Sequence, residues 1–229
     1  MIFPILFEDD YYLVAEKPAG LPSQATVDKS RPDFYTLLKA QVQAPPHSLA
    51  YLGLHHRLDR DTSGVMIFTK QKAANESLAL LFKEHRIQKT YLCLTKKKKK
   101  IQDEWTVENF LAEFRDAKLK KIRMRSVLSG GQKAITDFKV LQEYAAGFLI
   151  QAQPRTGRMH QIRVHLAESA LGIFGDDIYP CLNIPQAPRL MLHAHALEFE
   201  HPFTQQKIRV ESPMPQDMMA FAIDLSVQR

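Results

Sequence analysis

Cysteine is scarce in this chain of 229 residues, which contains only Cys93 and Cys181. Neither lies in a Cys-x-x-Cys pair, which excludes a disulfide framework and a thiolate metal site. A reducing compartment fits best, so we expect a cytoplasmic protein. No stretch reaches the roughly 18 consecutive apolar residues that cross a bilayer, so we expect no membrane partner. The N-terminus has no basic leader and turns acidic at Glu8, Asp9 and Asp10, which argues against a signal peptide.

The sequence also lacks an internal repeat, a Gly-rich phosphate loop and any low-complexity segment other than the lysine run 96–100. What it has is 45% hydrophobic residues, enough for one cooperative core and for a domain of two lobes. Its net charge of +6 and its isoelectric point near 9.2 favour a polyanionic partner, with nucleic acid first. The lysine run is either a contact to phosphates or a merely solvated loop.

A dense polar cluster, residues 55–64, lies between the apolar segments 49–54 and 65–68. It holds two histidines, two arginines and two aspartates, which are costly to desolvate unless they pair with one another or with a ligand. A functional site is one interpretation. The alternative is a solvated turn leading into a buried strand, in which Asp61 or Ser63 bonds locally and Gly64 takes an unusual backbone conformation.

Residues 56–64, His-Arg-Leu-Asp-Arg-Asp-Thr-Ser-Gly, closely resemble the His-Arg-Leu-Asp-x-x-Thr-Ser-Gly signature of the RluA-type pseudouridine synthases. The resemblance implies that Asp59 is the nucleophile. Residues 156–165 resemble the family's Thr-Gly-Arg-x-His-Gln-Ile-Arg-x-His string, in which Arg163 pairs with the nucleophile. An arginine on a helix surface is the alternative for Arg163.

The alternating segment 87–94 predicts a strand with Lys89 and Tyr91 on one face. A half-buried core tyrosine is the simple interpretation of Tyr91, whereas the resemblance places it against the target base. By the same resemblance, Arg57 fills the gap that a flipped base leaves. The residues we expect to bind RNA are Arg57, His56, Arg60, Arg158, His160 and Lys89. Two later segments also resemble the family: Gly175-Asp176 followed by Tyr179, and a strand near 190–194.

Local patterns predict the remaining elements. They are two short strands joined at residues 8–10, a turn at 17–20, a helix over 33–44 capped by Asp33, a helix over 70–86, antiparallel strands at 134–141 and 147–152, helical character from Thr156-Gly157 to about Ser169, and a short helix or frayed end over 214–228. The region 105–125 gives no clear strands. Its positive residues, which form a candidate RNA-facing edge, are Arg115, Lys118, Lys120, Lys121, Arg123 and Arg125.

The expected fold is a mixed α/β domain, a largely antiparallel sheet with flanking helices and a cleft lined by Asp59, Tyr91 and Arg163. We expect one catalytic domain over residues 1–229, monomeric and without a separate N-terminal RNA-binding module. The implied activity is an RNA pseudouridine synthase, acting on ribosomal RNA of the large subunit or on transfer RNA. It needs no cofactor and no metal; His193, His195 and His201 are interpreted as structural.

Two alternatives stay open at this stage. One is a non-catalytic RNA-binding protein on the same scaffold. The other is a glycosylase or phosphodiesterase that uses the carboxylates of Asp59 and Asp61. Within the synthase interpretation, attack by Asp59 on the uracil ring and attack on the sugar are both open.

Overall fold

The computed structural model describes residues 1–28, 30–45, 48–116, 121–180 and 186–227. The chain divides into two compact units. Unit 1 comprises Met1–Gln88 and Ala194–Pro213, and unit 2 comprises Lys89–His193 and Met214–Arg229. Three residues used in the sequence analysis lie outside the described residues: Lys118, Lys120 and Cys181.

Unit 1 is built on an antiparallel sheet. Its elements are β1 (Ile5–Glu8), β2 (Tyr12–Lys17), α1 (Phe34–Gln43), β3 (Gly53–Leu54), β4 (Ser63–Thr69), a 3-10 turn (Lys72–Ala74), α2 (Asn75–Lys83), most of β10 (Leu192–Glu200) and β11 (Lys207–Glu211). The strand order is β1-β2-β4-β10-β11, and β3 pairs with β4. The pairings β1 with β2, β2 with β4, and β10 with β11 are antiparallel.

The central strands of unit 1 are covered on both faces, because every residue of β4 and nearly all of β2 are buried. Helix α1 buries Phe34, Leu38 and Val42, which recur every four residues and so form one apolar stripe. The Asp33 carboxylate accepts a hydrogen bond from the Thr36 amide at 3.0 Å, which caps the helix as predicted. Unit 1 therefore supplies a rigid strand, β4, directly behind the polar cluster.

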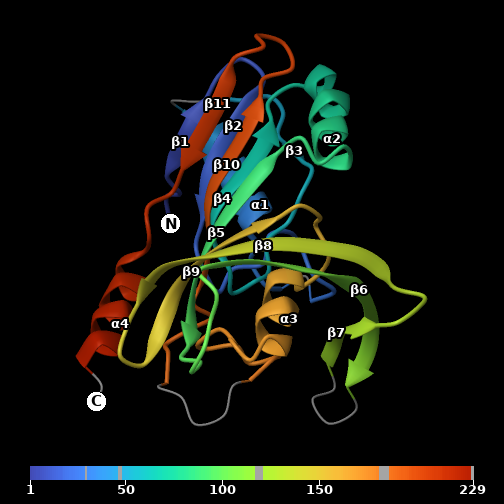
Figure 1. Cartoon of the computed structure of the whole chain (residues 1–229). Helices are drawn as coiled ribbons and strands as arrows, with labels where there is room; N and C mark the ends of the chain where they lie inside the picture. The colour runs from blue at the N-terminus through green and yellow to red at the C-terminus, as the bar shows by residue number, and fades with distance from the viewer. Residues whose placement is uncertain (29, 46–47, 117–120, 181–185, 228–229) are drawn as a thin grey trace. The chain divides into compact units, whose positions relative to one another are not determined.

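Unit 2 is also built on antiparallel strands and contains two helices. Its elements are most of β5 (Gln88–Lys96), β6 (Glu104–Asp116), β7 (Lys121–Val127), β8 (Gln132–Glu143), β9 (Gly147–Pro154), α3 (Gln161–Glu168) and α4 (Gln216–Val227). The strand order is β5-β9-β8-β6-β7, and these neighbours pair antiparallel. Helix α3 packs against β8 and β9, as Figure 1 shows. The core joins Phe148 and Ile150 of β9 to Ile162 and Leu166 of α3.

The predicted fold class is confirmed: the chain is a mixed α and β structure with largely antiparallel strands and flanking helices. The first hairpin, the capped helix and the strand pair β8–β9 lie where they were predicted. Two helix boundaries were wrong. The predicted helix 70–86 is a 3-10 turn followed by the shorter α2. Helix α3 begins only at Gln161, because His160 has a left-handed backbone, with φ of 53°.

Candidate active site

The backbone on both sides of Asp59 is held by buried polar side chains of unit 1. Ser23 Oγ donates to the Leu58 carbonyl at 2.7 Å and accepts from the Leu58 amide at 3.0 Å. Lys17 is fully buried, and its ammonium donates to the carbonyls of Pro18, Leu21 and Arg60 at 2.8, 2.8 and 3.0 Å. A half-buried carboxylate therefore sits between two fixed peptide groups.

The end of this loop is fixed by a close approach of two strands. Gly64, at the start of β4, has φ of +120°, and a Cβ built on it would lie 2.1 Å from the carbonyl oxygen of Ala194 in β10. Only glycine fits that backbone at that distance. The preceding Ser63 and Thr62 are buried. The glycine of the signature is therefore required by packing.

The two histidines of the cluster have structural partners in unit 1. His56 Nε2 accepts a hydrogen bond from the Ile67 amide at 3.0 Å, and its ring stacks on Phe82 with centroids 4.7 Å apart. His55 Nε2 lies 3.1 Å from Thr69 Oγ1, and burial lowers the pKa of His55. The ring of His56 therefore ties the loop to β4 and α2, a role that the sequence analysis did not predict. Its expected contact with RNA stays a prediction.

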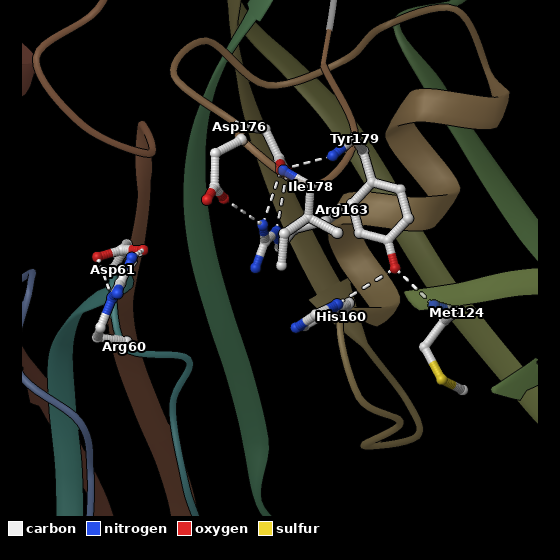
Figure 2. Close-up of polar contacts among 9 residues, drawn as sticks. Arg60, Asp61, Met124, His160, Arg163, Asp176, Ile178 and Tyr179 are labelled. Atoms are coloured by element: carbon white, nitrogen blue, oxygen red, sulfur yellow. Dashed lines mark hydrogen bonds and ion pairs between the residues drawn. The ribbon is translucent and has the colours of Figure 1, made fainter. Parts of the chain in front are cut away.

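The charged residues beside Asp59 are not equivalent. Arg57 is exposed and forms no ion pair with any residue that the structure describes. Arg60 holds Asp61 in a two-point ion pair, with Nε 3.0 Å from Oδ1 and Nη2 2.8 Å from Oδ2, as Figure 2 shows. The Asp61 carboxylate is thus occupied by a guanidinium, which weighs against a site that uses Asp59 and Asp61 as paired catalytic carboxylates.

In unit 2, Arg163 of α3 forms a buried ion pair with Asp176. Its Nε and Nη2 donate to the two carboxylate oxygens at 2.8 and 2.7 Å, and the two side chains are only 5% and 1% exposed. Figure 2 shows the guanidinium facing this carboxylate. Asp177, half exposed, lies 3.7 Å from the same guanidinium. The interpretation of Arg163 as a helix-surface arginine is therefore wrong.

Asp176 is itself fixed by the turn in which it lies. Its Oδ1 also accepts hydrogen bonds from the amides of Ile178 and Tyr179, both at 2.9 Å (Figure 2). The preceding Gly175 has φ of +73°, and a Cβ there would collide with the Arg189 carbonyl. The sequence analysis noted Gly175-Asp176 and Tyr179 as a likeness without giving them a role. Their role is to hold the Arg163 guanidinium in one orientation.

Tyr179 connects this turn to the start of α3. Its hydroxyl accepts from the Met124 amide at 2.8 Å and lies 3.2 Å from His160 Nδ1. Because that hydroxyl already accepts one bond, its own proton can go to His160 Nδ1, and the Nε2 of the neutral ring then carries the histidine proton. Burial raises the pKa of Tyr179 to about 12, so the hydroxyl keeps this proton at neutral pH. The Arg163 guanidinium lies 5.6 Å from the Tyr179 ring centre.

A buried polar network fixes the loop before α3. Gln161 accepts from Thr156 Oγ1 at 2.7 Å and from the Arg158 amide at 3.0 Å, and its amide group donates to Thr136 Oγ1 at 2.9 Å. His165 continues the network, with Nδ1 3.0 Å from Thr136 Oγ1. Burial lowers the pKa of His165 to about 4, so the ring is neutral at neutral pH. Arg158 and His160 therefore belong to a loop whose backbone is held in place by this network.

The predicted site residues fall into two groups, one in each unit. In unit 1 the polar cluster carries Asp59, Arg57, His56 and Arg60; in unit 2 lie Tyr91 and Lys89 on β5, Arg158 and His160 in the loop, and Arg163 on α3. Lys89 and Tyr91 are half-buried on the same face of β5, as the alternation predicted. Among the described residues, no three histidine, cysteine or acidic side chains are grouped closely enough to hold a metal ion.

Comparison with known proteins gives a consistent result. The family described as RNA pseudouridylate synthase matches residues 11–168. The chain is 36% identical over 221 residues to ribosomal large subunit pseudouridine synthase C of Yersinia pestis, covering 92% of this chain and 65% of that protein. It is 33% identical over 227 residues to ribosomal large subunit pseudouridine synthase D of Nitrosomonas europaea, covering 94% and 63%. The chain thus spans about two thirds of the length of these relatives.

Solved structures support the same fold. The human protein RNA pseudouridylate synthase domain containing 4 superposes with a TM-score of 0.79 at 23% identity, covering 98% of this chain and 94% of that one. The human protein RNA pseudouridylate synthase domain containing 1 gives a TM-score of 0.74, also at 23% identity, covering 99% and 96%. In the described part of the chain, no helix combines the length and the apolar character needed to span a membrane.

Proposed function

Because the chain belongs to the RNA pseudouridylate synthase family, we propose that it converts uridine to pseudouridine in RNA, with Asp59 as the nucleophile. The observation that carries the proposal is the fixation of the backbone on both sides of Asp59, by Ser23 at Leu58 and by Lys17 at the Arg60 carbonyl. A nucleophile held in place loses little freedom in the transition state.

The two units act together in this proposal, as one catalytic domain with a cleft lined by Asp59, Tyr91 and Arg163. A guanidinium has two edges that can each engage a carboxylate. Asp176 takes the Nε edge of Arg163, and the proposed partner on the other edge is Asp59. The positive charge of Arg163 would lie opposite the negative charge of the Asp59 carboxylate and orient that carboxylate for attack.

The reaction rearranges atoms that are all present in the substrate. The bond between uracil N1 and ribose C1′ breaks, the base turns, and a bond forms between uracil C5 and C1′. The proton on C5 is lost and N1 gains one, so uridine and pseudouridine have the same composition. Asp59 forms a bond, to the ring or to the sugar, and releases it at the end. The overall conversion therefore consumes no oxidant, reductant or second substrate.

The target base must leave its stack before Asp59 can reach it, at a cost of about a few kcal/mol that is lowest in loops and bulges. In the proposed complex the exposed Arg57 fills the space that the base vacates, and Tyr91 contacts the flipped base. Turnover of an Arg57→Ala variant should fall further on a stable hairpin than on a flexible loop of the same sequence. Equal losses on the two RNAs would contradict this role.

Ribosomal RNA of the large subunit is the first substrate to test, because the two relatives are named as ribosomal large subunit pseudouridine synthases. Transfer RNA is the second. The proposed setting is a monomer acting in the cytoplasm. The net charge of +6 suits a polyanionic substrate in either case.

The deciding experiment maps pseudouridine by carbodiimide modification and primer extension in ribosomal and transfer RNA. Three strains are compared: one with the wild-type protein, one without it, and one with Asp59→Ala. A site lost in both altered strains identifies the activity, the nucleophile and the substrate together. Asp61→Asn is the matched control, because its carboxylate is held by Arg60, and that strain should keep the modification. Persistence of every site in all strains, and no product when purified protein is given total RNA, would refute the proposal.

A further inference from the structure

Two neighbouring cations of unit 2, Lys89 and Arg158, lie at the loop that precedes α3. The Lys89 ammonium is 3.3 Å from the Thr156 carbonyl, and a methyl group built on Gly157 would lie 3.5 Å from the same nitrogen. The loop thus passes directly over the ammonium. Arg158 is the next residue, and its Nε donates to the Lys133 carbonyl at 3.0 Å.

Neither cation has an acidic partner among the residues that the structure describes. The basic side chains around them do. Arg155 is paired with Asp137 through contacts of 2.6 and 2.8 Å. The other pairs nearby are Lys133 with Glu108 and Lys139 with Glu104. The structure therefore neutralises the surrounding lysines and arginines but leaves this pair of positive charges together.

This arrangement costs free energy in the protein alone. Burial, and to a smaller degree the charge of Arg158, lower the pKa of Lys89 to about 8. Both effects oppose the charged ammonium. A bound anion would counter both effects, because it would supply the missing opposite charge and accept hydrogen bonds from the ammonium. Residues kept in unfavourable electrostatic surroundings are often found where a ligand binds.

We propose that Lys89 and Arg158 form a binding site for one backbone phosphate of the RNA, the phosphate adjacent to the nucleotide whose base contacts Tyr91. The inference rests on the proposed function. Lys89 and Tyr91 are two residues apart on one face of β5, which separates their Cα atoms by about 6.6 Å. That spacing is comparable to the distance between a base and its own phosphate. Two adjacent donors of positive charge suit a phosphate, whose charge is spread over several oxygens, better than a neutral base edge.

The test is a phosphate scan by binding. The RNA is a large-subunit ribosomal hairpin that the protein binds, and its phosphates are replaced one at a time by neutral methylphosphonate. All proteins carry Asp59→Ala so that affinity is read without turnover. With the Asp59→Ala protein, one phosphate position should cost about tenfold in Kd, the order expected for a charge-assisted contact. Adding Lys89→Met should raise the Kd for unmodified RNA about tenfold. The methylphosphonate at the sensitive position should then cause no further loss of affinity.

The matched control is Lys139→Met, which removes an exposed lysine of the same unit that is already paired with Glu104. This variant should leave the loss at the sensitive phosphate unchanged. Arg158→Gln should behave like Lys89→Met. Because Lys89→Met removes a desolvated charge, its melting temperature should equal or exceed that of the parent, whereas a structural role for Lys89 would lower it.

The outcome is distinguishable from failure of the proposed function, because binding and turnover are measured separately. If Lys89→Met loses the same further affinity as the parent at every phosphate, or if no single phosphate matters, the phosphate site is refuted even when the protein with Asp59 intact forms pseudouridine. If Lys89→Met abolishes the sensitivity to methylphosphonate at that position, but the protein with Asp59 intact forms no pseudouridine, the phosphate site is supported and the proposed activity is refuted.

Discussion

Replacing Asp176 by asparagine should destabilise unit 2 strongly, because the change breaks a buried ion pair from one side. The asparagine Oδ1 can still accept from the amides of Ile178 and Tyr179, but an NH2 group would face the donor Nε of Arg163. The guanidinium would stay buried after losing its nearest counter-charge, with the half-exposed Asp177 at 3.7 Å as the acidic group that the structure still places beside it. Breaking such a pair costs about 3–5 kcal/mol of unfolding free energy, or roughly 6–20 °C in melting temperature for a chain of this size.

A second ion pair in the same unit provides the control. Arg155 and Asp137 have nearly the same two-point geometry, with contacts of 2.6 and 2.8 Å, but the side chains are 63% and 30% exposed. Asp137→Asn should therefore cost only about 0.2–1 kcal/mol. Urea denaturation at pH 7, followed by circular dichroism, measures both variants. Costs that differ by less than about 1 kcal/mol would refute the reasoning that burial decides the value of this contact.

The same two variants also test whether Asp176 is a positioning residue for Arg163. If it orients the guanidinium toward the reaction centre, pseudouridine formation by Asp176→Asn should be impaired at a temperature where the variant is fully folded. Asp137→Asn should turn over normally under those conditions. Equal activities would leave Asp176 with a purely structural role.

Three further predictions concern the buried Lys17, two glycines with positive φ, and the buried His165. Lys17→Met should lower the unfolding free energy by about 2–4 kcal/mol in urea denaturation, because three part-buried carbonyls lose the donor that the fully buried Lys17 supplies. Gly64→Ala should cost more than about 3 kcal/mol, because its Cβ would collide with the Ala194 carbonyl, whereas Gly130→Ala, at φ of +74° with open space around it, should cost about 1 kcal/mol; melting temperatures of the two variants decide. For His165, burial lowers the pKa from 6.5 to about 4, so below pH 6.5 the unfolded chain takes up a proton that the folded chain does not. The unfolding free energy should therefore fall as the pH is lowered from 6.5 to 4, and this fall should be smaller in His165→Gln.

Each of these three has an outcome that contradicts it. Lys17→Met within about 0.5 kcal/mol of the parent would show that water replaces the ammonium at the carbonyls. Equal melting temperatures for the two glycine variants would mean that the strand next to Gly64 moves aside at no cost. An unchanged pH dependence in His165→Gln would assign that dependence to other groups.

Local chemistry in the sequence was enough to predict the elements that have their own signals. Asp33 caps α1 because a carboxylate three residues before an amide in the first turn bonds to it regardless of the rest of the fold. The β1–β2 hairpin and the half-buried face of β5 that carries Lys89 and Tyr91 followed from alternation. The family strings then singled out Asp59, Tyr91 and Arg163, whose joint action stays a proposal.

What could not be predicted depends on contacts between distant residues. Strand β6 alternates between exposed and half-buried residues, with only Leu111 fully buried, so it has no apolar pattern strong enough to mark a strand. The left-handed His160, which delays the start of α3, is set by the loop around it. The pairing of Arg163 with Asp176 joins a helix to a turn thirteen residues later, and nothing in the local sequence requires that contact.

The order of the two units along the chain has a genetic consequence. Unit 1 is made of Met1–Gln88 and Ala194–Pro213, and unit 2 of Lys89–His193 and Met214–Arg229, so each unit is encoded by two separate stretches of the gene. A fragment that stops at Gln88 lacks β11 and β10, and with them the carbonyl that Gly64 packs against. Neither unit can therefore be duplicated or fused to another protein as one continuous coding segment. Segments can be added before or after the two units, but a transfer that keeps both units whole has to carry Asp59 and Arg163 together, because the segments of the two units alternate along the chain.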